Sequence, residues 1–414
     1  MRTFMQHKLR LGMIGGGQGA FIGAVHRIAA RMDNAYELVC GAFSSDPGRS
    51  RISGEALGID PLRSYNSYKE LFEKESRLPE SQRVQVISIV TPNHLHFEPA
   101  KLALENGYHV VLDKPMTFSL AEARELQKVV DKSGKRFCLT HTYTGYPMVK
   151  EARAFVAAGR LGRVRKVYVE YPQGWLSRLE EGGDNKQASW RTDPKQSGIA
   201  GAMGDIGTHA FNLAEYVSGL SVSQMNADIH TVVPGRRLDD DGAVLLRFAP
   251  AATADAAAAN ATGAGNSASA TGGGHAASGV LMATQIAAGE ENNVRIRVYG
   301  ELGGLEWQQS DANTLQVKWL DRPMEIWRTG GGYVSSFASH NTRTPAGHPE
   351  GYLEAFANLY RNFAECITAD LEGKEPAPES LDYPGVAEGV RGMAFIEHVI
   401  ASGRSEQKWI PFTL

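Results

Sequence analysis

The sequence predicts an α/β domain with a parallel sheet, followed by an α+β domain with a large, mostly antiparallel open sheet. Over residues 1–145, short continuous apolar segments alternate with segments of helical periodicity, as in a parallel sheet covered by helices. Over residues 146–414, apolar and polar residues alternate within longer segments, which indicates strands with one solvated face. A chain of 414 residues is also long enough to form two domains.

In the first domain, we expect the continuous apolar segments to be buried strands and the segments between them to be helices. The last of these helices starts at Ser119, which can cap its first turn, and stops at Gly134. In chain order, the predicted strands are Leu9–Gly15, Tyr36–Ser44, Val84–Val90, His109–Pro115 and Arg136–Tyr143, and the helices cover 20–32, the segment after Pro47, 67–75, 97–107 and 119–134.

The second domain combines alternating strands, longer helices and one segment of unusual composition. Ala249–Gly279 contains 14 Ala and 6 Gly among its 31 residues, so it has almost no large apolar side chain to bury. We expect it to be a flexible insertion in the turn between two strands. The predicted strands are Val164–Tyr171, Ala243–Phe248, Gly279–Ala287, Val294–Gly300 and Thr314–Leu320, and the helices cover 208–219, 352–373 and 385–403.

The overall composition argues against several classes of protein. The formal net charge is −3 without a long basic run, so we expect neither nucleic acid nor a membrane as a partner. Cys40, Cys138 and Cys366 lie far apart, which fits neither a disulfide framework nor a metal site. No apolar run has the length of a membrane span, and the first residues lack the apolar core of an export signal. A cytoplasmic location is therefore expected.

A glycine-rich turn joins the first predicted strand to the first predicted helix. Gly15, Gly17 and Ala20 form a G-x-G-x-x-A pattern with Gln18 inside it, which is a dinucleotide-binding fingerprint. Gly15 permits the tight turn, and Gly17 lets the backbone approach a pyrophosphate at the helix N-terminus. Because further strand–helix units follow, the pattern favours a Rossmann domain that binds NAD or NADP over a glycine turn without a ligand.

The end of the second strand bears on the choice of cofactor. An acid at this position binds the ribose of NAD and would repel the additional phosphate of NADP. Here Ser44 and Ser45 occupy it, Asp46 follows, and Arg49 lies a turn further on. Serine does not repel the phosphate and no cation is adjacent, so both cofactors remain possible and NAD is slightly favoured.

Polar residues follow the third and fourth strands, whose carboxyl ends would border the nicotinamide of a bound dinucleotide. Asn93 is also expected to cap the helix that follows it. Asp113 and Lys114 end the fourth strand, and burying a lysine is costly. Lys114 is therefore either a solvated tip or a group held beside the reacting carbon. The residues proposed to border the cofactor after the third strand are Thr91, Pro92, Asn93 and His96.

Asp205 and His209 in the second domain are four residues apart, so one helical turn would point both side chains the same way. A histidine can exchange a proton at neutral pH, and a neighbouring carboxylate would hold its tautomer. The alternative is an acid at a helix N-terminus beside an exposed histidine. No third ligand at zinc or iron spacing accompanies them, so no metal site is predicted.

The motifs TPNHLH, acid-Lys-Pro and WRTDPKQSGIAGAMGDIGTH together resemble the Gfo/Idh/MocA family of NAD(P)-dependent oxidoreductases, and the resemblance covers essentially the whole chain. The family's acid-Lys-Pro triplet usually begins with Glu, whereas this chain has Asp113. The resemblance implies a homodimer or homotetramer supported by the open sheet. It also implies that the catalytic residues are Lys114, Asp205 and His209, and that Trp190 and Arg191 help to enclose the cofactor.

The resulting hypothesis is a dehydrogenase that transfers a hydride between a secondary alcohol of a sugar, sugar derivative or cyclitol and NAD(P). His209 is expected to take the hydroxyl proton and Lys114 to stabilise the developing alkoxide. Asp205 is expected to orient His209 or to bind a neighbouring hydroxyl. Alternatives are an NAD-dependent glycosidase that acts by transient oxidation, and a non-catalytic dinucleotide-binding regulator. Residues expected near the substrate are His141, Tyr143, Tyr146, Gln173, Trp175 and His348.

Overall fold

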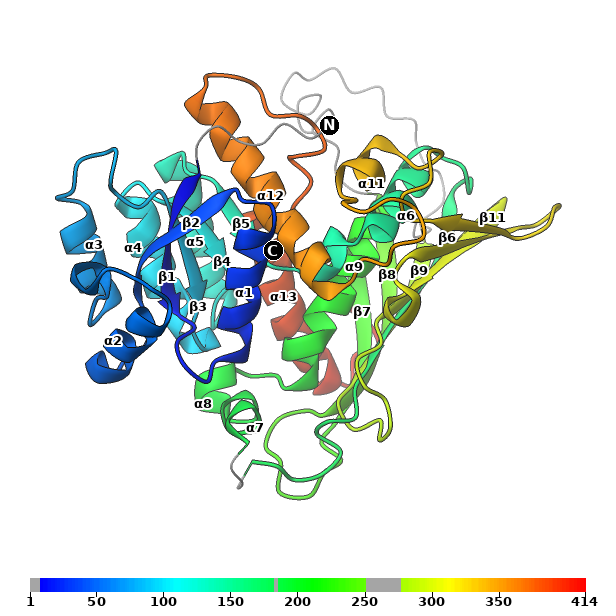
Figure 1. Cartoon of the computed structure of the whole chain (residues 1–414). Coiled ribbons are helices and arrows are strands. Elements are labelled where there is room, and N and C mark those ends of the chain that lie inside the picture. The colour runs from blue at the N-terminus through cyan, green and yellow to red at the C-terminus, as the bar shows by residue number, and fades with distance from the viewer. Residues whose placement is uncertain (1–7, 182–184, 251–276) are drawn as a thin grey trace, which may run out of the picture.

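The computed structural model describes residues 8–181, 185–250 and 277–414, which form two sheets with helices packed against them (Figure 1). The first sheet is parallel in every pairing, as the sequence predicts, and its strand order in the structure is β2-β1-β3-β4-β5. Its elements are β1 Leu9–Gly15, α1 Phe21–Met32, β2 Tyr36–Ala42, α2 Pro47–Ala56, α3 Tyr68–Glu75, β3 Val86–Val90, α4 Phe97–Glu105, β4 His109–Leu112, α5 Leu120–Ser133 and β5 Phe137–Leu139.

The caps of α5 follow the sequence prediction. Ser119 accepts a hydrogen bond from the backbone N–H of Glu122, and the helix ends directly before Gly134. The pattern of caps and periodicity therefore located this helix to within a residue at each end.

Three strands of the first sheet, β2, β4 and β5, end earlier than predicted, whereas β1 and β3 end where the sequence predicts. β2 ends at Ala42 and β4 at Leu112, because the residues that follow leave the sheet ladder. Phe43 shows the reason: its carbonyl accepts from Gly17 N, and its own N–H donates to Ser50 Oγ. The polar residues after each strand consequently stand in turns at the edge of the sheet, where they can face a ligand.

The second sheet is mostly antiparallel and has the order β13-β12-β11-β10-β6-β9-β8-β7-β14, with β6 and β9 parallel to each other. Burial alternates along its strands: in β9, Leu281 and Ala283 are buried while Met282 is exposed. One face is therefore packed and the other open, as predicted. The strands are β6 Val164–Pro172, β7 Leu220–His230, β8 Asp241–Pro250, β9 Ala277–Thr284, β10 Arg295–Gly300, β11 Gly303–Gln308, β12 Thr314–Trp319, β13 Glu325–Arg328 and β14 Ile410–Pro411.

The boundaries predicted for the Ala/Gly-rich insertion need a correction. β8 continues to Pro250 and β9 begins at Ala277, so both ends of the predicted insertion belong to strands. Backbone pairing explains the difference, because Ala277 pairs with Phe248 and Ala249 pairs with Ser221. Residues 251–276, on which the rest of the prediction falls, lie outside the described residues.

Helices from residues 147–403 pack between and onto the two sheets (Figure 1). α13 contacts both α5 and β7. α12 returns to the first domain, where Phe356, Tyr360 and Phe363 share a hydrophobic core with β1 and α1. No helix of the described residues is long and apolar enough to cross a membrane. The helices of this part are α6 Pro147–Ala157, α7 Lys186–Arg191, α8 Pro194–Ser197, α9 Thr208–Ser218, α11 Ser336–His340, α12 Tyr352–Leu371 and α13 Val386–Gly403.

Candidate active site

The glycine-rich turn after β1 has the shape that the phosphates of a dinucleotide require. Gly15 and Gly16 have φ angles of +81° and +71°, which favour glycine. A Cβ at Gly17 would lie 2.7 Å from the carbonyl oxygen of Phe43, so the backbone lies directly against the end of β2. α1 begins after Ala20 without a side-chain cap or an acid in its first turn, which leaves its first N–H groups for an anion. These residues fit a bound dinucleotide.

The end of β2 presents hydroxyl groups to this turn. Ser44 is partly buried and accepts a hydrogen bond from Asp46 N at 3.2 Å, whereas Ser45 and Gln18 are exposed. Asp46 caps α2, because its carboxylate accepts from Arg49 N at 2.7 Å. The nearest carboxylate is therefore engaged in a helix cap, and serine remains at the position where an acid would select NAD.

A buried histidine ties together the turns that follow β3 and β4. His96 Nδ1 lies 2.8 Å from the carbonyl oxygen of Pro115, and Nε2 lies 2.8 Å from that of Thr91. Because both ring nitrogens are occupied by backbone groups, His96 supports the shape of the predicted cofactor site from beneath.

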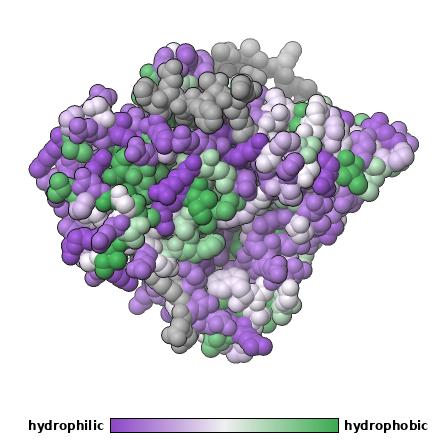
Figure 2. Space-filling view, in the orientation of Figure 1, coloured by the Kyte–Doolittle hydropathy of each residue, from purple (hydrophilic) through white to green (hydrophobic). Residues whose placement is uncertain are grey.

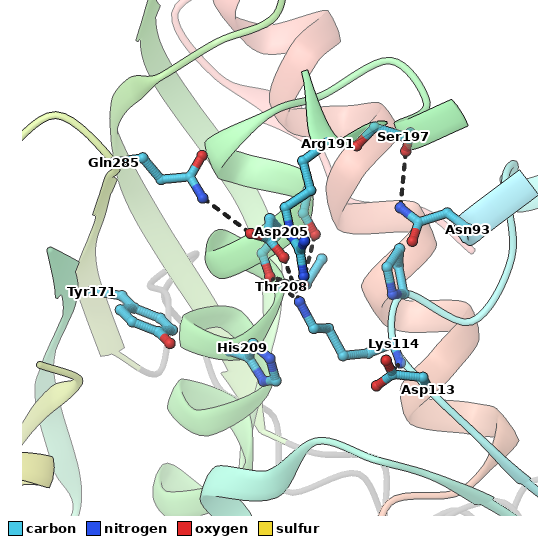
Figure 3. A network of polar contacts seen from close by, with 12 residues as sticks. Asn93, Asp113, Lys114, Tyr171, Arg191, Ser197, Asp205, Thr208, His209 and Gln285 are labelled. Carbon is cyan, nitrogen blue, oxygen red and sulfur yellow. Dashed lines mark hydrogen bonds and ion pairs between the residues drawn. The ribbon is translucent and has the colours of Figure 1, made fainter. Parts of the chain in front are cut away.

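Asn93 connects the two domains and does not cap α4. Its Nδ2 donates to the carbonyl oxygen of Ser197 at 3.1 Å (Figure 3). The predicted cap is wrong because a short 3₁₀ turn, Asn93–Leu95, follows Pro92, and α4 starts only at Phe97. The side chain is thus free to reach across to the segment before Asp205.

Lys114 reaches from the turn after β4 to the second domain. Its Nζ donates to Asp205 Oδ1 at 2.6 Å and to the backbone oxygen of Asp205 at 2.8 Å (Figure 3). Asp113 anchors the turn, since its Oδ1 accepts from Lys114 N at 3.0 Å and from Thr140 Oγ1 at 2.9 Å. Burial alone would raise the pKa of Asp113, but His26 and Lys114 hold it well below its usual range. Asp113 is therefore a charged carboxylate that stabilises the turn carrying Lys114.

Asp205 stands in a π-helical turn, Met203–Gly207, that leads into α9. The buried carboxylate of Asp239 holds this turn, because it accepts from Gly201 N at 2.6 Å and from Met203 N at 2.7 Å. The sequence predicted that Asp205 and His209 share an ordinary α-helical turn. The wider turn found here is of a kind that is frequent at functional sites.

The Asp205 carboxylate is shared by three side chains. Besides Lys114, Gln285 Nε2 donates to Oδ2 at 3.0 Å, and Arg191 Nε lies 3.4 Å from Oδ2. The Arg191 guanidinium also packs on the ring of Trp190, 4.3 Å from its centroid. Although burial by itself raises the pKa of Asp205, the charges of Lys114 and Arg191 outweigh it and lower the pKa to about 2. Asp205 is therefore a carboxylate that stays charged and binds the ammonium of Lys114 and the guanidinium of Arg191.

His209, in the first turn of α9, has a histidine as its polar neighbour. Its Nδ1 lies 3.4 Å from His141 Nδ1, and its ring meets that of Tyr143 edge-on at 5.0 Å. The Asp205 carboxylate contacts Lys114, Gln285 and Arg191, and within the described residues no hydrogen bond joins it to His209, so the structure does not support its predicted role of orienting His209. Burial lowers the pKa of His209 well below its usual value, and Lys114 and His141 lower it further.

Both domains line a cavity of about 450 Å³, which is bordered by Asp113, Lys114, Arg191, Asp205 and His209. Figure 2 shows the molecule in space-filling form in the orientation of Figure 1, with hydrophobic residues gathered between the domains near α1. Phe21, the first residue of α1, is exposed and lines the cavity. A cavity of this size accommodates a small molecule. Its further lining residues include Ile22, Thr140, Thr142, Tyr143, Tyr171, Gln173, Trp175, Gln187, Asn292, Gln309, Tyr352 and Phe356.

A hydrogen-bond network centred on Asn292 forms one wall of the cavity. Asn292 Oδ1 accepts from Tyr171 OH at 2.7 Å and from Gln173 Nε2, while its Nδ2 donates to Tyr143 OH at 3.1 Å and to Gln309 Oε1 at 2.8 Å. Tyr143 and Gln173 were predicted from the sequence to lie near the substrate, whereas Tyr171, Asn292, Gln309 and Gln285 were not. Gln285 and Gln309 each come directly after a strand, which is the signal that located Lys114.

The remaining predicted substrate residues lie at different distances from the cavity. Trp175 lines it and donates from Nε1 to Gln173 Oε1 at 3.0 Å. Tyr146 is buried behind Tyr143, with ring centroids 6.2 Å apart, and His348 is exposed in a loop that does not line the cavity. No group of three His, Cys, Asp or Glu in the described part of the chain is placed to hold a metal ion.

Comparison with protein families gives two matches that together span most of the chain. Residues 9–141 match the model of an oxidoreductase family with an NAD-binding Rossmann fold. Residues 149–306 match the model of the GFO/IDH/MocA C-terminal domain. Residues 142–148 lie between the two matched ranges.

Individual proteins are similar to the chain over nearly its whole length. The uncharacterized oxidoreductase YfiI of Bacillus subtilis is 30% identical over 98% of this chain and 97% of its own length. Levoglucosan dehydrogenase of Pseudarthrobacter phenanthrenivorans is 27% identical over 97% of both chains. The crystal structure of an inositol dehydrogenase homolog of Azotobacter vinelandii complexed with NAD+ is 33% identical, with 98% of each chain covered and a TM-score of 0.87.

Proposed function

Because the chain belongs to the GFO/IDH/MocA family of NAD(P)-dependent oxidoreductases, we propose that it oxidises a secondary alcohol of a sugar, sugar derivative or cyclitol in the cavity between its domains. One observation carries the proposal: Lys114 from the first domain meets Asp205 and His209 from the second in that cavity. They meet at the carboxyl ends of the parallel strands, the edge at which open α/β sheets bind their ligands.

Lys114 can both bind Asp205 and serve a substrate oxygen. An ammonium group carries three N–H donors, and Asp205 takes two of them through its carboxylate and its backbone oxygen. The third donor is left for the oxygen that loses its proton. Lys114 stabilises the negative charge that develops on this oxygen, and Asp205 keeps the ammonium in place.

His209 is the proposed proton acceptor. Burial and the nearby Lys114 favour the neutral imidazole, which is the form that can take a proton from a substrate hydroxyl. A bound NAD(P) would supply the hydride acceptor for the carbon that bears this hydroxyl. Gly15, Gly17 and the N-terminus of α1 would hold the phosphates of that cofactor, and Ser44 and Ser45 would border its ribose, with a slight preference for NAD.

The polar wall supports a substrate with several hydroxyl groups. Tyr143, Tyr171, Gln173 and Asn292 offer donors and acceptors that are already oriented by their mutual hydrogen bonds. Relatives named for inositol and for levoglucosan, both rings with several hydroxyl groups, support the same substrate class.

The test is a panel of sugars, sugar derivatives and cyclitols assayed with NAD and with NADP for formation of the reduced cofactor. We expect net reduction with at least one polyol. A second panel consists of chromogenic glycosides, and release of their aglycone without net reduction of the cofactor would identify the glycosidase alternative. Tight dinucleotide binding without turnover on either panel would identify the non-catalytic regulator and overturn the proposal.

A further inference from the structure

The proposed base, His209, is paired with a second buried histidine. His141 follows β5, is 2% exposed, and lies with its Nδ1 3.4 Å from His209 Nδ1. The two rings are nearly perpendicular, at 82°, with centroids 5.3 Å apart. The His141 backbone is held as well, since its carbonyl oxygen accepts from Thr144 Oγ1 at 2.9 Å. The pair is therefore held in place beside the cavity, which His209 lines and His141 does not.

The contact between the two Nδ1 atoms restricts where their protons can be. A neutral imidazole has one N–H donor and one bare acceptor nitrogen, so one Nδ1 must donate and the other accept. If His141 donates, His209 Nδ1 is the acceptor and its proton resides on Nε2, which then cannot take another. If His209 donates, its Nε2 is bare and can act as a base.

We propose that His141 is a positioning residue that accepts a hydrogen bond from His209 Nδ1 and thereby fixes His209 in the tautomer whose Nε2 is free for the substrate proton. This inference rests on the proposed function and refines it. The sequence suggested that the Asp205 carboxylate holds the tautomer of His209, whereas here the neutral ring of His141 takes that role. After proton transfer, the charged His209 retains the same hydrogen bond.

The surroundings explain why a neutral acceptor suits this position. The groups that face His209 are Lys114 and Asp113 from the turn after β4, His141 and Tyr143 from the turn after β5, and Tyr171 from β6. Burial lowers the pKa of His141 to about 3, with a smaller effect from Lys114, so His141 stays uncharged at neutral pH. A carboxylate there would stabilise the charged imidazole and make the proton harder to release.

The tautomer can be observed without any turnover. In protein labelled with ¹⁵N at histidine, long-range ¹H–¹⁵N correlation spectra distinguish a protonated from a bare ring nitrogen. Spectra of His209→Asn and His141→Asn assign the two rings. We expect His209 to carry its proton on Nδ1 and His141 on Nε2. A proton on His209 Nε2 in the wild-type protein would overturn the inference.

Kinetics give a second readout on the polyol that the substrate panel identifies. His141→Phe keeps a ring but no acceptor, and we expect kcat to fall on the order of 10²-fold with little change in KM. The kcat of His141→Asn should be at least about tenfold higher than that of His141→Phe, because the amide oxygen of Asn can accept a hydrogen bond near the position of Nδ1. His230 is exposed, so His230→Phe serves as the control and should have the kcat and KM of the wild type.

The outcomes separate the inference from the proposed function. Wild-type kcat in His141→Phe would contradict the inference even if the polyol is oxidised normally. Failure of every polyol would contradict the proposed function, while the spectra would still decide the tautomer. If His141→Phe does not fold, the wild-type spectra and the His141→Asn kinetics remain decisive.

Discussion

The Lys114–Asp205 and Lys150–Asp382 pairs have the same local geometry in different surroundings. In each pair the lysine Nζ donates both to a carboxylate oxygen and to the backbone oxygen of the same aspartate. Each pair also borders a cavity, of about 450 Å³ for the first and about 620 Å³ for the second. Neither an ion pair nor the volume of a cavity therefore identifies the active site.

What separates the pairs is the remaining hydrogen-bonding capacity and the neighbouring chemistry. The third donor of Lys150 points to Tyr216 OH at 3.5 Å, and the Lys150 and Asp382 side chains are 0% and 4% exposed. The Lys114 and Asp205 side chains are 15% and 17% exposed, beside a histidine base and the strand ends of the first sheet. The residues that line the larger cavity all come from 150–391, so none of them belongs to the turns after the strands of the first sheet, where the cofactor is expected to bind.

The strongest test of this comparison is the matched replacement of the two lysines by methionine. Lys114→Met should lower kcat on the order of 10²–10⁴-fold, because it removes the group that stabilises the developing alkoxide. Dinucleotide affinity should remain nearly intact. Lys150→Met should keep the kcat of the folded enzyme, and equal losses in both variants would remove the distinction between the pairs.

The same two variants should differ in the opposite sense in stability. Lys150→Met leaves the buried Asp382 with Arg153 and Tyr216 alone, and we expect the free energy of unfolding to fall by about 3 kcal/mol. Lys114→Met should cost less than about 1 kcal/mol, because Asp205 keeps Arg191 and Gln285 and remains partly solvated. Urea unfolding measures both values. A larger loss for Lys114→Met would make that pair structural.

The pH dependence of kcat/KM should carry the signature of His209. A base acts when unprotonated, and its lowered pKa keeps it unprotonated to below pH 6.5, so the acidic limb of wild type should lie below that pH. Lys114→Met removes a cation that lowers this pKa, so the limb of its residual activity should move to higher pH. Lys150→Met should not move it. A limb that persists unchanged in His209→Asn would assign the base elsewhere.

The smallest expected effect concerns the choice of cofactor. Ser44→Asp places a carboxylate where the additional phosphate of NADP would lie, and repulsion of about 1 kcal/mol should shift the ratio of the NAD and NADP Kd values about fivefold toward NAD. Ser221→Asp adds the same charge at the larger cavity and should leave the ratio unchanged. Equal ratios in both variants would mean that the ribose lies away from Ser44.

The sequence predicted the parts of the site that depend on local pattern. Lys114 and the glycine turn were located because a parallel sheet collects the residues after its strands at one edge. α6 was missed, although Pro147 at its first position is a start signal. The return of α12 onto α1 was not predictable, because periodicity shows that a helix has an apolar face and not what covers it.

The contacts inside the cavity depended on the fold and were predicted only in part. Lys114, Asp205 and His209 were expected to lie together, but spacing along the chain could not show that Asp205 would face Lys114 while His209 faces His141. Asn292 lies between strands that pair with distant partners, and its four hydrogen bonds exist only after the sheet has formed.

The most direct measurement follows the hydrogen itself. The wild-type protein would be incubated with NAD(P) and with the preferred polyol carrying deuterium on its reactive carbon, and the mass of the recovered cofactor would be determined. If the cavity around Lys114 and His209 oxidises alcohols, deuterium accumulates in the reduced cofactor in the same amount as the oxidised polyol, and Lys114→Met strongly slows this accumulation whereas Lys150→Met does not. A cofactor that stays oxidised while the substrate is consumed, or deuterium transfer that is unaffected in Lys114→Met, would contradict the account.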